Sequence, residues 1–117
     1  MDLKELATHI DLDLAGSLKR FSNMEPLYKK YLKKFVAEPT FATFLTDIKD
    51  PSNLEAIEVS AHTMKGICGN LGLKTLFDNY NAIVSDVRTN AGGNLSALSQ
   101  QAIDNTNVAV EFIKQLD

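Results

Sequence analysis

The sequence lacks a second cysteine, an excess of positive charge and any long apolar run, and each absence excludes a class of protein. Cys68 is the only cysteine, so no internal disulfide can form. The formal net charge of −3 gives no general attraction to nucleic acid, and no basic motif with interleaved aromatics is present. No apolar run approaches the roughly 18 residues of a membrane span, and residues 1–13 lack a signal-peptide pattern. We therefore expect a cytoplasmic protein that binds neither nucleic acid nor membrane.

What the sequence does contain is the composition and periodicity of a helical domain. The 117 residues, 44% hydrophobic and 23% charged, suit a single globular domain over residues 1–117. Apolar residues recur at spacings of three and four along most of the chain, and no segment reads as a strand. Pro51 and the segment Asn90–Asn94 interrupt this pattern. We expect an all-α protein in which one or two short helices, at Leu3–Ile10 and Leu14–Phe21, precede the longer ones.

The most informative stretch runs from Ser52 to Leu73. Pro51 and the capping pattern of Ser52 with Glu55 predict a helix that begins at Ser52 and runs to about Gly69. At about 100° per residue, one face of this helix gathers apolar residues and should be buried: Ile57, Ala61, Met64 and Cys68. His62 points away from that face and should be exposed. Within roughly 60° of it lie Glu58, Lys65, Gly66 and Gly69.

The two glycines on the exposed side of this helix suggest a docking surface. A glycine inside a helix costs about 1 kcal/mol relative to alanine, and no internal packing demand is expected at Gly66 or Gly69. We interpret their bare backbone as space that lets another macromolecule approach the His62 imidazole. Lys65, three residues on, can place a positive charge beside an anionic group on the ring. This combination suits a phosphoryl group that passes between proteins.

Two plainer interpretations stay open. A histidine on a helix is often an ordinary surface residue, and the face around His62 could belong to a non-catalytic helical module that only docks a partner. His9, near the end of the first helix, lacks neighbouring glycines or lysines, and we interpret it as a solvated residue favoured by the helix dipole.

The segment AHTMKGICGNLGL resembles the signature of histidine-containing phosphotransfer domains. The matching positions are His62, Lys65, Gly66, Gly69, Gly72 and Leu73. Weaker similarity extends over most of the chain, and Leu27–Phe35 is similar to the preceding helix of that family, with Tyr28, Leu32 and Phe35 in its aromatic and aliphatic places. Some members carry Gln or Glu twenty-two residues after the histidine, where it bonds the ring. This chain has Val84 there, in an apolar stripe that should be buried.

The resemblance implies a fold, a function and partners. The fold would be an antiparallel four-helix bundle, and His62 would be the phosphoacceptor. The partners would be receiver domains and a hybrid sensor kinase, with the phosphoryl group taken from an aspartyl phosphate of one receiver and passed to another. The protein would act as a monomeric carrier, not an enzyme, with no cofactor or nucleotide site of its own. Lys65 would stabilise the phosphoryl charge, and Gly66 and Gly69 would form the docking floor.

The helix expected after Asn23 has one apolar and one basic side. Asn23 suits an N-cap, and Pro39 should end or kink this helix. The basic side carries Lys29, Lys30, Lys33 and Lys34. Such a face is usually solvated. The alternative is that some of these lysines lie beside His62 and steer an acidic partner toward it, and Lys33 is then the candidate docking residue.

Other chemistries are poorly supported by the residues. The glycines at 66, 69 and 72 are not followed by the GK[ST] of a phosphate-binding loop, and they lack the dinucleotide-binding spacing. Cys68 and His62 are six residues apart and fall on nearly opposite sides of a helix, so they cannot form a catalytic dyad. Two distant histidines and one inward cysteine offer no metal-ligand set.

Overall fold

The computed structural model describes every residue from Met1 to Asp117 and contains seven helices and no strand. They are α1 (Leu3–His9), α2 (Leu14–Arg20), α3 (Glu25–Phe35), α4 (Pro39–Asp47), α5 (Leu54–Asn70), α6 (Lys74–Asn90) and α7 (Leu95–Ile113). The predictions of an all-α fold and of two short N-terminal helices are confirmed. None of the seven helices combines the length and the apolar character that crossing a lipid bilayer requires.

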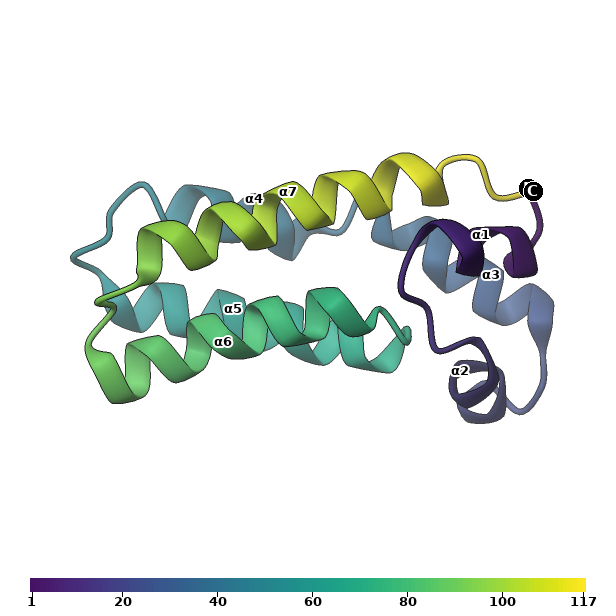
Figure 1. Cartoon of the computed structure of the whole chain (residues 1–117), viewed down its shortest axis with the longest axis horizontal. Helices are drawn as coiled ribbons and strands as arrows, with labels where there is room; N and C mark the ends of the chain where they lie inside the picture. The colour runs from purple at the N-terminus through teal and green to yellow at the C-terminus, as the bar shows by residue number, and fades with distance from the viewer.

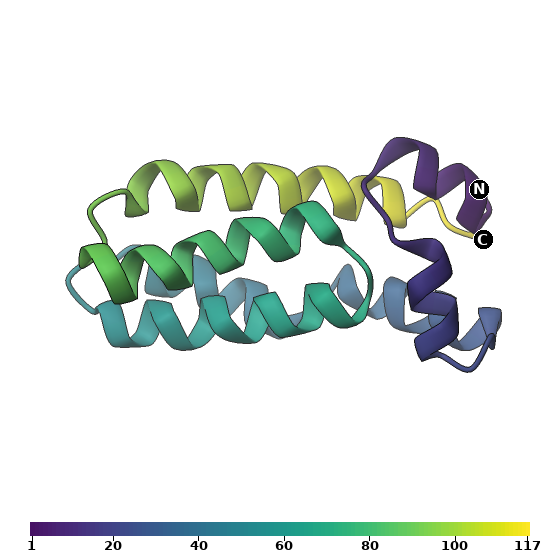
Figure 2. The same ribbon diagram turned by 60° about the horizontal axis from the view of Figure 1, so that its bottom comes forward.

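The longest helices, α5, α6 and α7, run side by side along the long axis of the molecule, each in the direction opposite to the one before it (Figure 1). Helix α4 packs against α5, α5 against α6 and α6 against α7. The longest dimension is 41 Å, whereas a helix of 19 residues spans only about 28 Å. The remaining length comes from α1, α2 and α3, which gather at one end together with both termini (Figures 1 and 2).

One cluster of 21 buried hydrophobic side chains joins all the helices except α2. Val84 is 2% exposed and lies in this core, as its place in the apolar stripe of α6 predicts. Two buried tyrosines keep their hydroxyls bonded, which removes the cost of burying them. Tyr28 donates to the carbonyl of Leu71 at 2.7 Å, and the hydroxyls of Tyr80 and Thr106 lie 2.7 Å apart.

The turn between α5 and α6 is held by the segment that follows α1. The amide of Asp13 donates to the carbonyl of Gly72 at 2.9 Å, and the amide of Lys74 donates to the carbonyl of Asp11 at 3.2 Å. Gly72 has φ +71°, and a Cβ there would collide with Ser17 Oγ. This glycine is therefore required by the turn itself and needs no partner to explain it.

Two predicted helix boundaries in the N-terminal half are wrong. Asn23 has φ +59° and follows Ser22 at φ +55°, so both lie in a left-handed turn, and Met24 takes the N-cap position of α3 without a side-chain cap. Pro39 does not end this helix, which already stops at Phe35. It begins α4 instead, at a position where a missing N–H leaves no bond unmade.

Candidate functional site

The helix that carries the candidate site begins slightly later than the sequence predicts. Asn53 is its N-cap, and the Oδ1 atom accepts a hydrogen bond from the amide of Ala56 at 3.2 Å. Ser52, the predicted cap, donates its hydroxyl to Asp50 instead. The helix then continues to Asn70, close to the expected end. The predicted capping pair of Ser52 and Glu55 is therefore wrong, although the helix it indicated exists.

The buried face of α5 is the predicted one. Ile57, Ala61, Met64 and Cys68 are each 0% exposed. Burial, reinforced by the negative charge of Glu38, raises the pKa of the Cys68 thiol to about 12. The thiol therefore stays protonated at neutral pH, and it lies in the core while His62 is exposed. Cys68 is a structural residue, and a dyad with His62 is excluded by this placement.

His62 stands on the exposed side of α5 with its ring free. No hydrogen bond or ion pair involves the imidazole, so both ring nitrogens are open to solvent or to a partner. Val84, twenty-two residues after His62, is buried, and its side chain has no polar atom to offer the ring. Val59, one turn before His62, is 62% exposed. We call the exposed side of α5 around His62, with Glu58, Val59, Lys65 and Gly66, the His62 ridge. The exposed valine gives this ridge an apolar contact point.

The Lys65 ammonium lies in the neighbourhood of His62 but is directed toward α6. Lys65 is half-buried, and its Nζ lies 5.6 Å from the centroid of the Phe77 ring. No carboxylate pairs with it. A cation over an aromatic ring at an exposed site is worth about 0.5–1 kcal/mol. That is weak enough for an anionic group on His62 to draw the flexible side chain away.

The two glycines near His62 have different environments. A Cβ at Gly66 would meet nothing within 4 Å, so this position is open on the exposed side of the helix. A Cβ at Gly69 would lie 3.1 Å from the edge of the Phe77 ring, and the Gly69 carbonyl also accepts a bond from Arg20 at 3.3 Å. The expectation that no packing demand explains Gly69 is therefore wrong. Gly66 is therefore the one of the two glycines that no contact within the fold explains.

An ion pair flanks His62 that the sequence did not reveal. The carboxylate of Glu58, one turn before His62, accepts a hydrogen bond from the Nε atom of Arg88 on α6. The Arg88 side chain remains 56% exposed. The pair joins residues 30 positions apart, and only the antiparallel contact of α5 with α6 brings them together. It adds a second cation to the surface on the α6 side of the ridge.

On the other side of the ridge, α4 and α5 enclose a polar groove. Its volume is about 540 Å³, and its lining is mostly hydroxyl, amide and carboxylate side chains together with the exposed Val59. The carboxylates are Asp47 and Glu55, and Thr63, next to His62 in the chain, is also part of the lining. A partner that covers His62 would therefore meet a concave polar surface on this side.

The structure does not bring Lys33 to His62. Lys33 lies on α3, in a cleft with Lys29, Lys30, Lys34, Pro26 and Asp117, and no residue of α5 lines this cleft. Helix α3 packs against α2 and α7. The alternative in which Lys33 lies beside His62 across a helix pair is therefore wrong. The sequence alone does not show which helices become neighbours, so it could not exclude this alternative.

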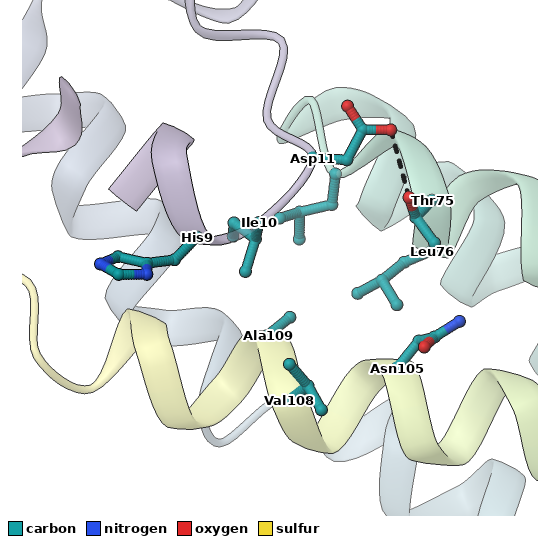
Figure 3. A pocket seen from close by; sticks show the side chains of 9 residues that line it. His9, Ile10, Asp11, Thr75, Leu76, Asn105, Val108 and Ala109 are labelled. Atoms are coloured by element: carbon teal, nitrogen blue, oxygen red, sulfur yellow. Dashed lines mark hydrogen bonds between the residues drawn. The ribbon is translucent and has the colours of Figure 1, made fainter. Parts of the chain in front are cut away.

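The second histidine has a structural role. His9 ends α1, and its exposed ring stacks on Phe112 with centroids 4.6 Å apart and planes at 8°. It borders a small hollow of about 180 Å³ between the segment after α1 and helices α6 and α7 (Figure 3). Asp11 accepts a bond from Thr75 at this hollow. No residue of the His62 ridge lines it, so the two places are separate.

No group of three or more His, Cys, Asp or Glu side chains comes together in a way that could hold a metal ion. Helix spacing puts Glu58, Val59, Lys65 and Gly66 within one turn of the exposed imidazole along α5, and the ion pair with Glu58 adds Arg88. Comparison of the chain with models of known protein families, with curated proteins and with solved structures finds no match.

Proposed function

We propose that this protein is a phosphocarrier of a two-component phosphorelay, built as an antiparallel four-helix bundle with α4, α5, α6 and α7 around one core. The observation that carries the proposal is the free imidazole of His62 beside the open surface of Gly66. An exposed ring with no internal bond stabilises nothing in the fold, and both of its nitrogens are free to react with a partner. It is the arrangement that an intermolecular nucleophile requires.

The chemistry needs only the ring from this chain. A neutral imidazole nitrogen attacks the phosphorus of an aspartyl phosphate, the P–N bond forms as the P–O bond breaks, and the receiver's carboxylate leaves. The reverse reaction passes the phosphoryl group to a second receiver. Because phosphoryl transfer passes through a loose transition state, positioning and positive charge supply most of the stabilisation. The receiver would bring the metal ion, and this chain would bring the nucleophile.

Lys65 is the proposed source of positive charge on this chain. Its ammonium has no carboxylate partner and rests over Phe77 in a weak contact. A dianionic phosphoryl group one turn away attracts it more strongly than the ring does, so we expect Lys65 to swing toward phosphorylated His62. Arg88 is held by Glu58 and is less free to respond.

The surface around His62 would accept the receiver. Gly66 leaves room for a close backbone approach, and Val59 offers an exposed apolar contact. The groove between α4 and α5 gives the partner a concave edge to follow. Gly69 contributes less to this docking floor than the resemblance implies, because Phe77 already lies against it.

A non-catalytic interaction module is the alternative function, and the same exposed valine and open glycine favour it. The two functions differ in one respect. A carrier becomes phosphorylated on the ring, whereas a docking module binds its partner and takes up no label.

The test is incubation of the full chain with a set of receiver domains phosphorylated by a small-molecule phosphodonor in the presence of Mg²⁺. We expect an acid-labile, alkali-stable label on the chain, the stability pattern of a P–N bond. His62→Gln should abolish the label, and His9→Gln is the matched control that should keep it. Equal labelling of His62→Gln and the parent would refute the proposal.

A further inference from the structure

The basic face of α3 is the strongest concentration of one charge on the molecule. Lys29 and Lys33, and likewise Lys30 and Lys34, are four residues apart, and Lys30 and Lys33 are three apart, so the four lysines share one side of the helix. Lys30, Lys33 and Lys34 are exposed, and none of the four lies in an ion pair. Like charges one turn apart oppose helix formation. The face thus carries a repulsion that no carboxylate of this chain relieves through a direct ion pair.

These lysines line a shallow, open cleft on the surface. With Pro26 and Asp117 they line a cleft of about 500 Å³ in which Pro26 is the one apolar residue. The Asp117 carboxylate also lines the cleft. The hydrogen bond from the Met1 ammonium at 2.7 Å lowers the pKa of this carboxyl, and the charges of Lys29 and Lys33 add to the effect. A carboxylate therefore already occupies the rim of the cleft, and its charge is complementary to the lysines that line it.

The cleft lies away from the His62 ridge. Helix α3 belongs to the end of the molecule that holds α1, α2 and both termini, whereas His62 is in the middle of α5 (Figures 1 and 2). No residue of α5 lines the cleft, and no lysine of α3 lines the groove beside His62. A partner on α3 would leave the ridge free.

We propose that the lysine face of α3 is a second docking surface, which binds an acidic segment of a partner protein through the cleft between α3 and the C-terminal residues. A carboxylate-rich segment fits because the cleft is lined by ammonium groups and is already bordered by one carboxylate. A long nucleic acid fits less well, because the chain as a whole carries a net charge of −3. An anionic bilayer would need a larger apolar contact than the single Pro26 ring that lines the cleft.

The test uses a fluorescent oligoglutamate peptide titrated with the full chain at low ionic strength. Lys30→Glu/Lys33→Glu should weaken binding by about tenfold or more, since it reverses two charges in the cleft. The matched control, Lys19→Glu/Lys49→Glu, makes the same change in net charge at exposed lysines of α2 and the loop after α4, and it should weaken binding much less. Circular dichroism checks that both variants remain helical.

Three results would overturn the inference. The first is equal loss of binding in the two double variants, which would mean that only net charge matters. The second is no loss in Lys30→Glu/Lys33→Glu. The third is tighter binding of vesicles rich in phosphatidylserine, or of single-stranded DNA, than of the peptide. His62→Gln should bind the peptide like the parent, so the outcome is independent of whether His62 accepts a phosphoryl group.

Discussion

At the scale of single residues, Gly66 and Gly69 show two different reasons for glycine in one helix. Gly66 has open space where a Cβ would stand, and Gly69 has the edge of Phe77 there at 3.1 Å. The glycine at position 66 therefore lowers helix stability without improving any contact inside the fold. The glycine at position 69 allows α5 and α6 to pack closely. This difference can be measured without knowing the function.

Gly66→Ala should raise the free energy of unfolding by about 0.5–1 kcal/mol, because alanine restricts the unfolded backbone and meets no neighbour. Gly69→Ala should gain less or lose stability, because Phe77 must shift to admit the methyl group. Urea denaturation of the two variants measures both values. An equal or larger gain at Gly69 would contradict the packing account.

The same open position can be tested for function. Gly66→Gln should leave the fold at least as stable as the parent but slow phosphoryl transfer, since a long side chain one turn from His62 would stand in the path of the receiver. Transfer rates from a phosphorylated receiver measure the effect, and Ala97→Gln on the exposed surface of α7 is the control. If Gly66→Gln accepts the phosphoryl group as fast as the parent does, Gly66 has no role in docking the receiver.

Lys65→Ala should slow transfer, or shorten the lifetime of the phosphorylated chain, by about tenfold while the bundle stays folded, because one charge-assisted hydrogen bond to the phosphoryl group is lost. Lys65→Arg should retain most of the function, and Lys74→Ala, an exposed lysine at the start of α6, should change nothing. Time courses of label gain and label decay give both quantities. If Lys65→Ala behaves as the parent toward several receivers, the ammonium has no part in the transfer.

Residues of the site differ in how far the sequence predicts them. The exposure of His62 and the burial of Cys68 follow from helix periodicity alone, because side-chain direction is set by the rotation per residue. The contact of Gly69 with Phe77 and the pairing of Glu58 with Arg88 depend on how α5 meets α6. No local rule encodes that register.

At the scale of elements, helix ends are where sequence reasoning is weakest. Ser52 and Asn53 are both good caps, and the choice of Asn53 follows from the turn that ties the Ser52 hydroxyl to Asp50. Asn23 is a good cap by type but adopts a left-handed conformation, which asparagine tolerates and which removes it from the cap position. Cap residues identify the neighbourhood of a helix end, and the flanking turn decides the residue.

The end of α6 depends on a buried carboxylate. Asp86 is 6% exposed and accepts bonds from the Asn94 amide at 3.0 Å and from the Asn90 side chain at 3.0 Å, so it ties α6 to the start of α7. Asp86→Ala should lower the free energy of unfolding by about 1–3 kcal/mol, because the Asn94 amide and the Asn90 side chain lose a charged acceptor. Asp78→Ala, at an exposed position of the same helix, should stay within about 0.5 kcal/mol of the parent. Thermal or urea unfolding distinguishes them, and similar losses in both variants would contradict this role.

At the scale of the whole molecule, the core sets a pH limit on stability. Burial raises the pKa of Cys68 to about 12 from 9.0, and that of Tyr28 to about 12 from 10.0. Above pH 9 the unfolded chain therefore releases protons that the folded chain keeps, which favours unfolding. The free energy of unfolding should be constant with respect to these groups below pH 9 and should fall between pH 9 and pH 12.

Urea unfolding at a series of pH values measures this decline. Cys68→Ala removes one of the buried groups whose pKa is raised, so the stability of the variant should fall less steeply over the same range. It should start from a lower value because the core loses a sulfur atom. A parent stability that stays flat through the window would show that the buried groups ionise without unfolding.

The molecule as a whole separates two surfaces that the sequence could not place relative to each other. The His62 ridge lies along α5, and the lysine face lies at the end formed by α1, α2 and α3 (Figure 1). Both faces can be read from periodicity, because each belongs to one helix. Their separation depends on the contacts of α3 with α2 and α7, which join residues far apart in the chain.

The most direct test of the central claim is to locate the phosphoryl group on the chain. After incubation with a phosphorylated receiver and Mg²⁺, mass spectrometry of peptides prepared under alkaline conditions should find the added mass on the peptide that contains His62. Addition of an unphosphorylated receiver should then remove it. Added mass on the His9 peptide, no added mass with any receiver, or a label at His62 that no receiver can take back would contradict a carrier function.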